Sequence, residues 1–251
     1  MIEYATRPGD CLEIKARPYK KDFPYSYTCG VFPTIELMDH CPSAVFRIIV
    51  SSRIAKGYDL LKERAARLNV PLVTDDKTIE RLSPKENCFA IGLFVKYACT
   101  LDPARHHIVL VNPSDMGNLG TIIRTADWFG IKKIVISEDT CDPWQPKVIQ
   151  STMGSIFRTQ ISETNIVDFL KEVKTPVFGA LMQGKNLYQT QIKDNQGVII
   201  IGSESHGIRE NVMPYVNCPI TIPKAEGSET ESLNASMAAG IIMAEVFRRN
   251  L

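Results

Sequence analysis

Short hydrophobic runs alternate along this chain with segments whose apolar residues have helical spacing. The run VFRIIVSS at residues 45–52 is rich in β-branched residues, which predicts a buried strand. Helical spacing follows in GYDLLKERAARLN (57–69), and VPLVTDD (70–76) predicts a second short strand. A helix, a turn containing proline and a strand are expected over residues 76–97. Residues 45–97 therefore predict a compact α/β domain.

The first 40 residues show no clear periodicity, because proline and glycine interrupt every pattern. The interrupting residues are Pro8, Gly9, Pro18, Pro24, Gly30 and Pro33. Such residues favour turns and end regular elements. We expect strands and loops in this stretch.

Continuous rather than alternating hydrophobicity marks the second half of the chain. The runs are HIVLVN (107–112), KKIVIS (132–137), PVFGALM (176–182), GVIIIGSE (197–204) and PITIP (219–223). Strands that are covered on both faces show this pattern, so the runs predict a parallel sheet between helices. The polar, proline-containing CTLDPARH separates the two halves. We therefore expect two domains, over residues 1–101 and 102–251.

The charge of the chain is nearly balanced, with a formal net charge of +1 over 251 residues. This length is enough to bury a sizeable core in one or two domains. Because no global field attracts a polyanion, a nucleic-acid partner would have to be held by local basic patches. The charge lowers the expectation of an RNA partner without excluding it.

Cysteine usage and the N-terminal sequence indicate a reducing compartment. The seven cysteines form no CxxC pair and no Cys/His cluster, so neither a disulfide framework nor a zinc site is expected, and we predict no metal. The N-terminal stretch lacks the apolar core of a signal peptide, and no uncharged apolar run is long enough to span a bilayer. We expect a soluble, cytoplasmic protein.

Glycine, asparagine and arginine interrupt an otherwise apolar helical pattern in DMGNLGTIIRTADWFG (115–130). Gly117 and Gly120 allow a tight turn into the helix, and Asn118 is suited to cap it. Arg124 lies about a turn and a half further on. Open α/β sheets bind ligands at the carboxyl ends of their strands, so both side chains could reach a site there. A capping asparagine and an arginine paired to an acidic neighbour would explain the same sequence.

A second glycine-bearing turn lies in IIIGSESHGI (199–208). Gly202 directly follows an apolar strand and permits close approach of the backbone to a ligand. Glu204 is a carboxylate in a short loop between two glycines. A simple strand-to-helix turn with a solvated glutamate is the alternative, and His206 is interpreted as a surface residue.

The third such turn lies in TIPKAEGSETESLNASMAAGIIMAEVFRR (221–249), where a helix is expected to begin near Ser232. Ser232 and Asn234 lie at the polar mouth of this helix, and on their own they would be explained by N-capping. The residues that follow are nearly all small or apolar. This composition predicts a helix that is buried all round, either within the monomer or against a second subunit.

The three turns together resemble the motifs of one enzyme family. NLGTIIRTADWFG, GSESHGI and IPKAEGSETESLNASMAAGIIMAE are similar, in this order, to the three successive motifs of the SpoU/TrmH branch of the SPOUT RNA methyltransferases. The resemblance covers most of the predicted second domain. Residues 45–97 also resemble, less sharply, the L30e-like RNA-binding domain that often precedes it.

The resemblance implies a fold, a cofactor and an assembly. The second domain would be a parallel α/β sheet with a deep trefoil knot, preceded by an L30e-like substrate-binding domain. S-adenosyl-L-methionine would lie bent in the knot, held by backbone groups around Gly202, Ile222 and Leu233, with the loop after Met182 nearby. The family's active site is completed across a homodimer interface.

The reaction implied is methylation of a ribose 2'-hydroxyl in RNA, with ribosomal RNA favoured because of the L30e-like front domain. Arg124 is the residue implied to act on that hydroxyl. A guanidinium stays protonated, so stabilising the emerging alkoxide or orienting a phosphate suits it better than proton abstraction. By the same resemblance, Asn118, Ser232 and Asn234 would fix the arginine and the ribose, and Glu204 would order the cofactor loop or pair with a cation.

Two clusters in the first domain are candidates for RNA contacts. The basic clusters are Lys15, Arg17, Lys20 and Lys21, and Arg53, Lys56, Lys62, Arg64 and Arg67. The aromatic residues Tyr19, Phe23, Tyr25 and Tyr27 interleave with the first cluster and could stack on unpaired bases. Solvated faces and an ordinary core are equally compatible with these clusters. Trp144 and Arg158 are further possible substrate contacts, for which structural roles are favoured.

Other functions remain open at this point. A tRNA 2'-O-methyltransferase of the same family is one, and a catalytically idle RNA-binding or assembly factor is another. A degenerate copy would be expected to lose Arg124 or Asn234, and both are present. A dinucleotide-binding oxidoreductase is disfavoured because the chain has no GxGxxG turn followed by an acidic residue at the usual spacing, and it has no P-loop either.

Overall fold

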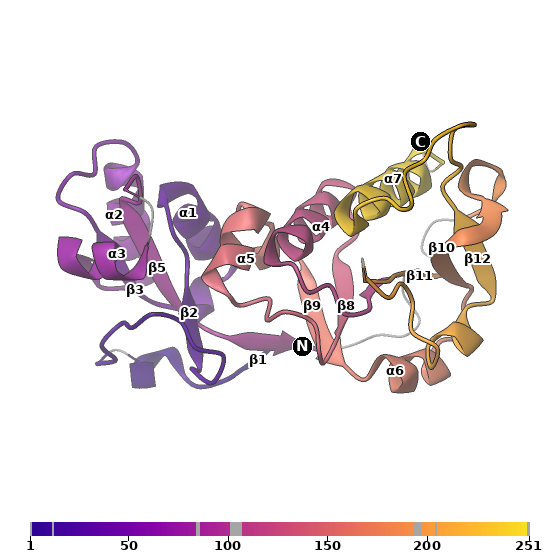
Figure 1. Ribbon diagram of the computed structural model, residues 1–251. Helices are drawn as coiled ribbons and strands as arrows, with labels where there is room; N and C mark the ends of the chain where they lie inside the picture. The colour runs from indigo at the N-terminus through magenta and orange to yellow at the C-terminus, as the bar shows by residue number, and fades with distance from the viewer. Residues whose placement is uncertain are drawn as a thin grey trace. The chain divides into compact units, whose positions relative to one another are not determined.

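The structure is a computed structural model in which residues 2–11, 13–83, 86–100, 107–192, 197–203 and 205–249 are described. The chain forms two compact units (Figure 1). Unit 1 comprises Met1–Cys99 and Asp142–Arg158, and unit 2 comprises Thr100–Cys141 and Thr159–Leu251.

Unit 1 is built on a four-stranded mixed sheet in the order β2-β5-β3-β4. Its strands are β2 (Tyr25–Tyr27), β3 (Val45–Val50), β4 (Leu72–Thr74) and β5 (Ala90–Val95). The α-helices that precede β5 in the chain are α1 (Val31–His40), α2 (Tyr58–Leu68) and α3 (Asp76–Leu82). A separate antiparallel pair is formed by β1 (Ile2–Tyr4) and β6 (Tyr97–Cys99). All residues of β5 are buried, as the continuous apolar run requires. The helices and strands expected between residues 45 and 97 are confirmed.

Helix α1 corrects the expectation of strands and loops for the first 40 residues. Pro33 lies in the first turn of α1, where a backbone N–H has no partner within the helix, so proline does not disrupt it. Gly30 precedes the helix with a φ of 109°, a conformation that favours glycine. The same two residue types that were interpreted as breakers therefore begin a helix here.

The segment Asp142–Arg158 packs with unit 1 although it lies within the range predicted for the second domain. It contains α5 (Pro146–Thr152), the helix expected after the proline-rich turn. The Trp144 ring packs edge-on against Phe94 and Tyr97, with centroid distances of 5.7 and 4.7 Å. Arg158 forms an ion pair with Glu36. Both side chains that were possible substrate contacts thus have structural partners within unit 1.

Unit 2 contains a six-stranded sheet in the order β12-β10-β11-β7-β8-β9, and every pairing in it is parallel. The strands are β7 (His107–Leu110), β8 (Lys133–Ser137), β9 (Gln160–Thr164), β10 (Val177–Asn186), β11 (Val198–Ile201) and β12 (Cys218–Thr221). The parallel α/β fold predicted from the five apolar runs is confirmed. Strand β9 was not predicted, because it lies at the sheet edge and its sequence QISET is no apolar run. Helix α6 (Ile166–Glu172), which follows β9, was also not predicted.

Helices α4 (Met116–Trp128) and α7 (Ala235–Arg248) lie side by side in parallel (Figure 1). Thr125 of α4 lies beside Gly240 of α7, where an added Cβ would be 3.9 Å from the threonine methyl group. At the carboxyl ends of the two helices, the rings of Phe129 and Phe247 are 5.5 Å apart. The second helix is not buried all round within the chain, as one alternative had it, because Met237 and Phe247 are exposed. Within the described part of the chain, no helix is long and apolar enough to cross a membrane.

Candidate active site

The turn after β7 leads directly into α4 and places the first motif. Asp115, not Asn118, caps the helix, since the Asp115 Oδ1 accepts a hydrogen bond of 2.7 Å from the Asn118 backbone N–H. The capping role predicted for Asn118 is therefore wrong. The helix begins earlier than the sequence suggested because Gly117 and Gly120 adopt helical positions within it. The Asn118 side chain is consequently available for a different contact.

Asn234 makes that contact across 116 positions of sequence. Its Nδ2 donates a hydrogen bond of 3.1 Å to the Asn118 Oδ1. Its Oδ1 meanwhile accepts from the backbone N–H groups of Ser236 and Met237 and so caps α7. The first and third motifs thus meet at the amino ends of two parallel helices. Ser232 lies two residues upstream in an exposed loop, and among the described residues its side chain has no hydrogen-bond partner.

Arg124 points from α4 into solvent one and a half turns beyond Asn118. Within the described ranges its guanidinium forms neither a hydrogen bond nor an ion pair. The alternative in which an acidic neighbour neutralises Arg124 therefore has no support from those residues. A fixed positive charge without an internal partner is suited to an anionic group from outside the chain.

Gly202 directly follows β11 at the start of the second motif, and the space beside it is filled by the chain itself. A Cβ on Gly202 would overlap the carbonyl group of Gly207. Ser203 and Gly207 exchange backbone hydrogen bonds of 3.1 and 2.9 Å, which hold the loop closed. Glycine is required here because the loop backbone folds back on the strand. The approach of this backbone to a ligand, expected from the sequence, stays a prediction. Glu204 lies outside the described residues.

The ends of β10 and β12 provide apolar surface near the third motif. The register of β10 against β12 shifts between Ala180 and Lys185, and Met182 in this irregular stretch is exposed. The Thr221 hydroxyl donates a hydrogen bond of 3.2 Å to the Met182 carbonyl oxygen, so Ile222 begins its loop beside Met182.

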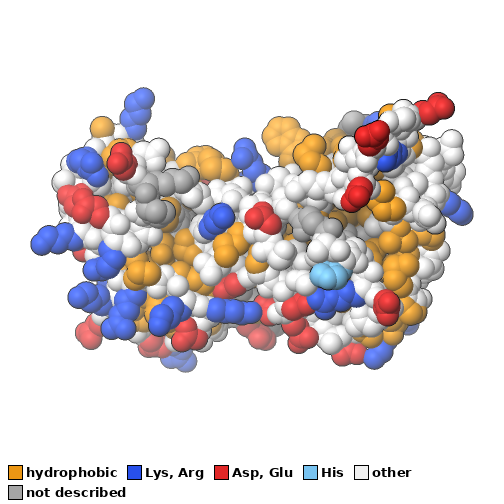
Figure 2. Space-filling view, viewed as in Figure 1, with side chains coloured by type: hydrophobic (Ala, Val, Ile, Leu, Met, Phe, Trp, Pro, Cys, Tyr) orange, Lys and Arg blue, Asp and Glu red, His pale blue; other side chains and the backbone are white. Residues whose placement is uncertain are grey.

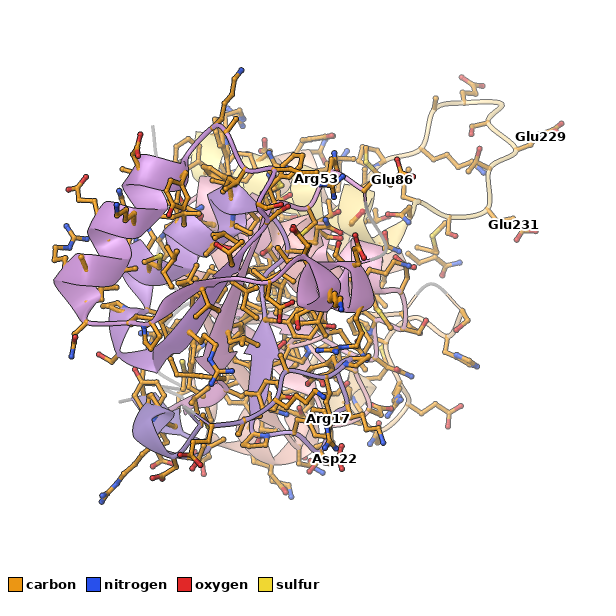
Figure 3. All side chains as sticks on the ribbon, turned by 90° about the vertical axis from the view of Figure 1, so that its left-hand side faces the viewer. Arg17, Asp22, Arg53, Glu86, Glu229 and Glu231 are labelled. Atoms are coloured by element: carbon orange, nitrogen blue, oxygen red, sulfur yellow. The ribbon has the colours of Figure 1, made fainter. Side chains whose placement is uncertain are left out.

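Leu233 is exposed at the other end of that loop. Figure 3 shows Glu229 and Glu231 on the same loop, which projects away from the body of the unit. S-adenosylmethionine has an adenine ring with apolar faces and polar edges. The exposed side chains of Met182 and Leu233 offer apolar surface of the kind on which such a ring packs.

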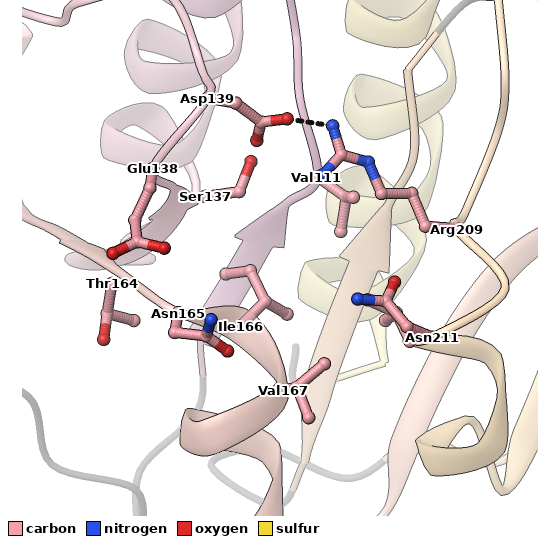
Figure 4. A pocket seen from close by; sticks show the side chains of 11 residues that line it. Val111, Ser137, Glu138, Asp139, Thr164, Asn165, Ile166, Val167, Arg209 and Asn211 are labelled. Carbon is pink, nitrogen blue, oxygen red and sulfur yellow. Dashed lines mark hydrogen bonds and ion pairs between the residues drawn. The ribbon is translucent and has the colours of Figure 1, made fainter.

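A pocket of about 240 Å³ lies at the carboxyl ends of β7, β8 and β9 (Figure 4). Val111, Ile166 and Val212 form its apolar part, and the ion pair of Arg209 with Asp139 lies at its edge. Burial acts to raise the pKa of Asp139, but hydrogen bonds from Arg209 and Ser137 bring it below its ordinary value. None of the predicted site residues lines this pocket.

The aromatic residues that interleave with the first basic cluster belong mainly to the core of unit 1. Tyr25 and Tyr27 are buried, and the Phe23 ring stacks on Tyr25 at 5.3 Å. Burial also raises the pKa of Tyr27 to about 12. The Tyr19 hydroxyl donates a hydrogen bond to Asp142. These aromatic side chains therefore already have packing or hydrogen-bond partners within unit 1, which favours a role in the core over stacking on RNA bases.

The second basic cluster is partly neutralised. Asp39 accepts two hydrogen bonds from Arg64, of 2.7 and 2.9 Å, and lies 3.6 Å from Arg67. Lys56 and Lys62 form no ion pair with any described residue. Figure 2 shows Lys and Arg side chains over the unit 1 part of the face drawn, with Asp and Glu side chains among them. The described residues contain no group of three or more His, Cys, Asp or Glu side chains that could hold a metal ion.

Comparison with known proteins supports the motif assignment. The family model of the SpoU rRNA Methylase family matches residues 105–244. The 23S rRNA (guanosine(2553)-2'-O)-methyltransferase RlmP of Bacillus subtilis is 30% identical over 146 residues, which are 57% of this chain and 58% of that protein. The chain thus aligns with little more than half the length of this relative.

Solved structures extend the likeness over most of the chain. An AdoMet-bound rRNA methyltransferase from Sinorhizobium meliloti is 22% identical with a TM-score of 0.79, covering 91% of this chain and 88% of that one. The SpoU methyltransferase AviRb from Streptomyces viridochromogenes, in complex with AdoMet, is 20% identical with a TM-score of 0.78, covering 90% and 91%. At these identities the likeness establishes the fold.

Proposed function

Because the chain belongs to the SpoU rRNA methylase family, we propose that it transfers a methyl group from S-adenosylmethionine to a ribose 2'-hydroxyl of RNA. The hydrogen bond between Asn234 and Asn118 carries this proposal. It joins the first and third motifs at the amino end of α4, the helix that presents Arg124. A structural cap alone would not require that contact, since Asp115 already caps α4.

The loops after β11 and β12 hold the cofactor in this proposal. Gly202 keeps the first loop tightly folded, and Ile222 and Leu233 bound the second loop. When bound, S-adenosylmethionine supplies a methyl group attached to a positively charged sulfur, which is an excellent leaving group. The trefoil knot that the family resemblance implies would be formed by the segment after β11. This arrangement needs no metal ion.

Arg124 stabilises the reacting oxygen. A ribose hydroxyl is a poor nucleophile, so it must be oriented toward the methyl group while negative charge develops on it. The exposed guanidinium has several donors in a fixed plane and remains protonated, so it can bind that oxygen or the adjacent phosphate. The proton leaves to solvent or to another group.

The remaining motif residues position the ribose and the arginine. The Asn234 Nδ2 fixes the Asn118 amide at the amino end of α4. Ser232, exposed beside them in the loop, offers a hydroxyl to the ribose or phosphate. Glu204 orders the cofactor loop or pairs with a cation in this proposal.

Ribosomal RNA is the substrate we favour, because unit 1 precedes the methyltransferase unit as an L30e-like domain would. Transfer RNA is the alternative within the family. Lys56 and Lys62, which form no ion pair among the described residues, are candidates for phosphate contacts. A cytoplasmic location goes with this proposal, since none of the seven cysteines forms a disulfide, as is usual in a reducing compartment.

A homodimer through α4 and α7 is the second part of the proposal. Trp128 is 83% exposed, Met237 59% and Phe247 41%, although all three are large hydrophobic residues on this helix pair. Exposed apolar patches of this kind mark interaction sites, and aromatic residues dominate interface energies. Figure 2 shows hydrophobic side chains at the surface above α4. Because Arg124 lies four residues before Trp128 on the same helix face, a second copy there would help to complete the site.

Light scattering after size exclusion tests the dimer. The wild type should have twice the chain mass, and Trp128→Glu should have the single chain mass with an unchanged melting temperature. A monomeric wild type at micromolar concentration would remove the dimer from the proposal.

Transfer of a radiolabelled methyl group from S-adenosylmethionine to bacterial RNA that lacks ribose methylation tests the reaction. A methyl group on the 2'-oxygen blocks alkaline cleavage of the following phosphodiester bond. We therefore expect label in alkali-resistant dinucleotides, and the size of the labelled RNA identifies ribosomal or transfer RNA. Cofactor binding without label in any RNA fraction would favour an idle RNA-binding factor.

A further inference from the structure

Asn112 occupies an unusual position between β7 and the first motif. Its φ of 53° lies in the left-handed region, which few residues other than glycine adopt. Its backbone N–H donates a hydrogen bond of 2.8 Å to the buried Ser137 hydroxyl at the end of β8. The turn therefore begins with a backbone conformation that is held by the neighbouring strand.

The Asn112 side chain lies between the two members of an ion pair. In the amide orientation that satisfies both neighbours, Nδ2 donates to the Asp139 carbonyl oxygen and Oδ1 accepts from the Arg209 guanidinium, each at 2.9 Å. Arg209 also pairs with the Asp139 carboxylate (Figure 4). The three residues come from the segments that follow β7, β8 and β11. Asparagine suits position 112 for two reasons: its amide bonds to both Asp139 and Arg209, and its backbone tolerates a positive φ.

The cluster connects both sides of the proposed active site. On one side, Arg209 lies two residues after Gly207, whose backbone closes the cofactor loop on Ser203. On the other side, the Cys141 N–H donates a hydrogen bond of 3.2 Å to the Pro113 carbonyl oxygen, and Asp115 then caps α4. A continuous set of contacts therefore runs from the cofactor loop to Asn118.

We propose that Arg209, Asp139 and Asn112 form a positioning latch that couples the cofactor loop to the turn presenting Asn118 and Arg124. The proposal rests on the function given above. Stability alone is a weak explanation for the latch, because the side chains of Arg209 and Asp139 are 40% and 44% exposed. Ion pairs so exposed contribute little to folding stability. A geometric role explains why the amide of a residue in the left-handed conformation is inserted between them.

Two variants remove the latch in different ways. Arg209→Gln removes the charge, while Asn112→Gly keeps the backbone conformation without strain and removes only the amide contacts. Lys171→Gln is the matched control, since it breaks the exposed Asp168–Lys171 pair on α6, neither member of which belongs to the three motifs or to the latch. Three quantities are measured for each variant: the melting temperature, methyl-transfer turnover at saturating S-adenosylmethionine, and hydrogen–deuterium exchange of the ligand-free protein.

We expect both latch variants to lose about tenfold to a hundredfold in turnover, the scale of a small misplacement of reacting groups. Their melting temperatures should stay close to that of Lys171→Gln. Exchange should become faster at the amides of Asn118, Cys141 and Gly207 together, and the double variant should be no slower in turnover than the worse single variant.

Turnover within twofold of wild type, with exchange changed only next to the substituted residue, would overturn the latch. Multiplicative losses in the double variant would also overturn it, because they would show independent roles. If the wild type transfers no methyl group, the proposed function fails. The exchange measurement still decides for or against the latch in that case, since it needs no activity.

Discussion

Residues 19–27 of unit 1 and residues 115–124 of unit 2 combine polar and apolar side chains in a similar way, but the structure uses them differently. In the first segment Tyr25 and Tyr27 are buried, and the Tyr19 hydroxyl is bound to Asp142. In the second, Arg124 is exposed and has no partner in the described part of the chain. Folding engages the aromatic side chains of the first segment internally and leaves Arg124 of the second segment available to a ligand.

The difference teaches how to separate function from structure in a sequence of this kind. Aromatic residues near basic ones indicate nucleic-acid binding only if their rings remain accessible. A charged group that the chain itself does not neutralise is a better indicator, because proteins pair or hydrogen-bond most charges that folding restricts. We therefore expect substitutions in the first segment to change stability and those in the second to change chemistry.

Arg124→Ala gives the largest expected effect and tests the second half of the comparison. Removing one donor to the transition state should lower turnover by about two orders of magnitude. Because the side chain is exposed, the melting temperature and the affinity for S-adenosylmethionine should remain near those of wild type. Lys171→Ala serves as a control for loss of an exposed cation. An unchanged rate for Arg124→Ala would remove this residue from the mechanism.

Tyr27→Leu tests the first half of the comparison. Because the ring is buried, its removal should lower the free energy of unfolding by about 1 to 3 kcal/mol. Turnover and RNA affinity of the folded protein should change by less than about twofold, since the ring does not face solvent. Weaker RNA binding at unchanged stability would restore base stacking as its role.

Asn234 sharpens the comparison because one side chain has both a structural and a functional contact. Asn234→Ala removes the cap of α7 and the bond to Asn118, so we expect a loss of about 0.5 to 2 kcal/mol of stability. Asn234→Asp keeps an oxygen for the cap but loses the donor to Asn118. Both variants should lose about tenfold in turnover, whereas only the alanine variant should melt earlier. A fully active aspartate variant would show that the contact with Asn118 is dispensable.

Glu245 provides a structural counterpart within unit 2. Hydrogen bonds from Arg248 hold the pKa of this buried carboxylate at about 2, despite the opposing effect of burial, and Arg249 contributes as well. A carboxylate with a lowered pKa stabilises the fold above its ordinary pKa of 4.5, and this contribution is lost as the pH falls toward 2.

Glu245→Gln should therefore destabilise the protein by about 1 kcal/mol at pH 7. Urea unfolding at several pH values measures the difference, which should shrink as the pH falls below 4.5. A difference in the free energy of unfolding that is constant with pH would contradict the ionic role of Glu245. A change in turnover would contradict its purely structural role.

The sequence predicts the strands of unit 2 well because their apolar runs are long enough to be distinctive. It fails at α1, where Pro33 and Gly30 have positional roles that a breaker rule ignores. It also places Asn118 at a cap that Asp115 occupies three residues earlier, since both residue types are good caps and residue type alone does not fix where the helix begins.

Contacts between distant segments are the other part that the sequence leaves out. Asn112, Asp139 and Arg209 are far apart along the chain and conform to no motif, so only the parallel strand order brings them together. The nearest signals were positional: Asn112 ends an apolar run before the first motif, and Arg209 directly follows the second.

Mass spectrometry of nucleosides from RNA treated with the wild type and with Arg124→Ala tests the central claim most directly. Our account predicts a 2'-O-methylnucleoside that accumulates with the wild type and is reduced about a hundredfold with the variant, at equal S-adenosylmethionine binding. A methyl group on a base, or equal product from both proteins, would contradict it.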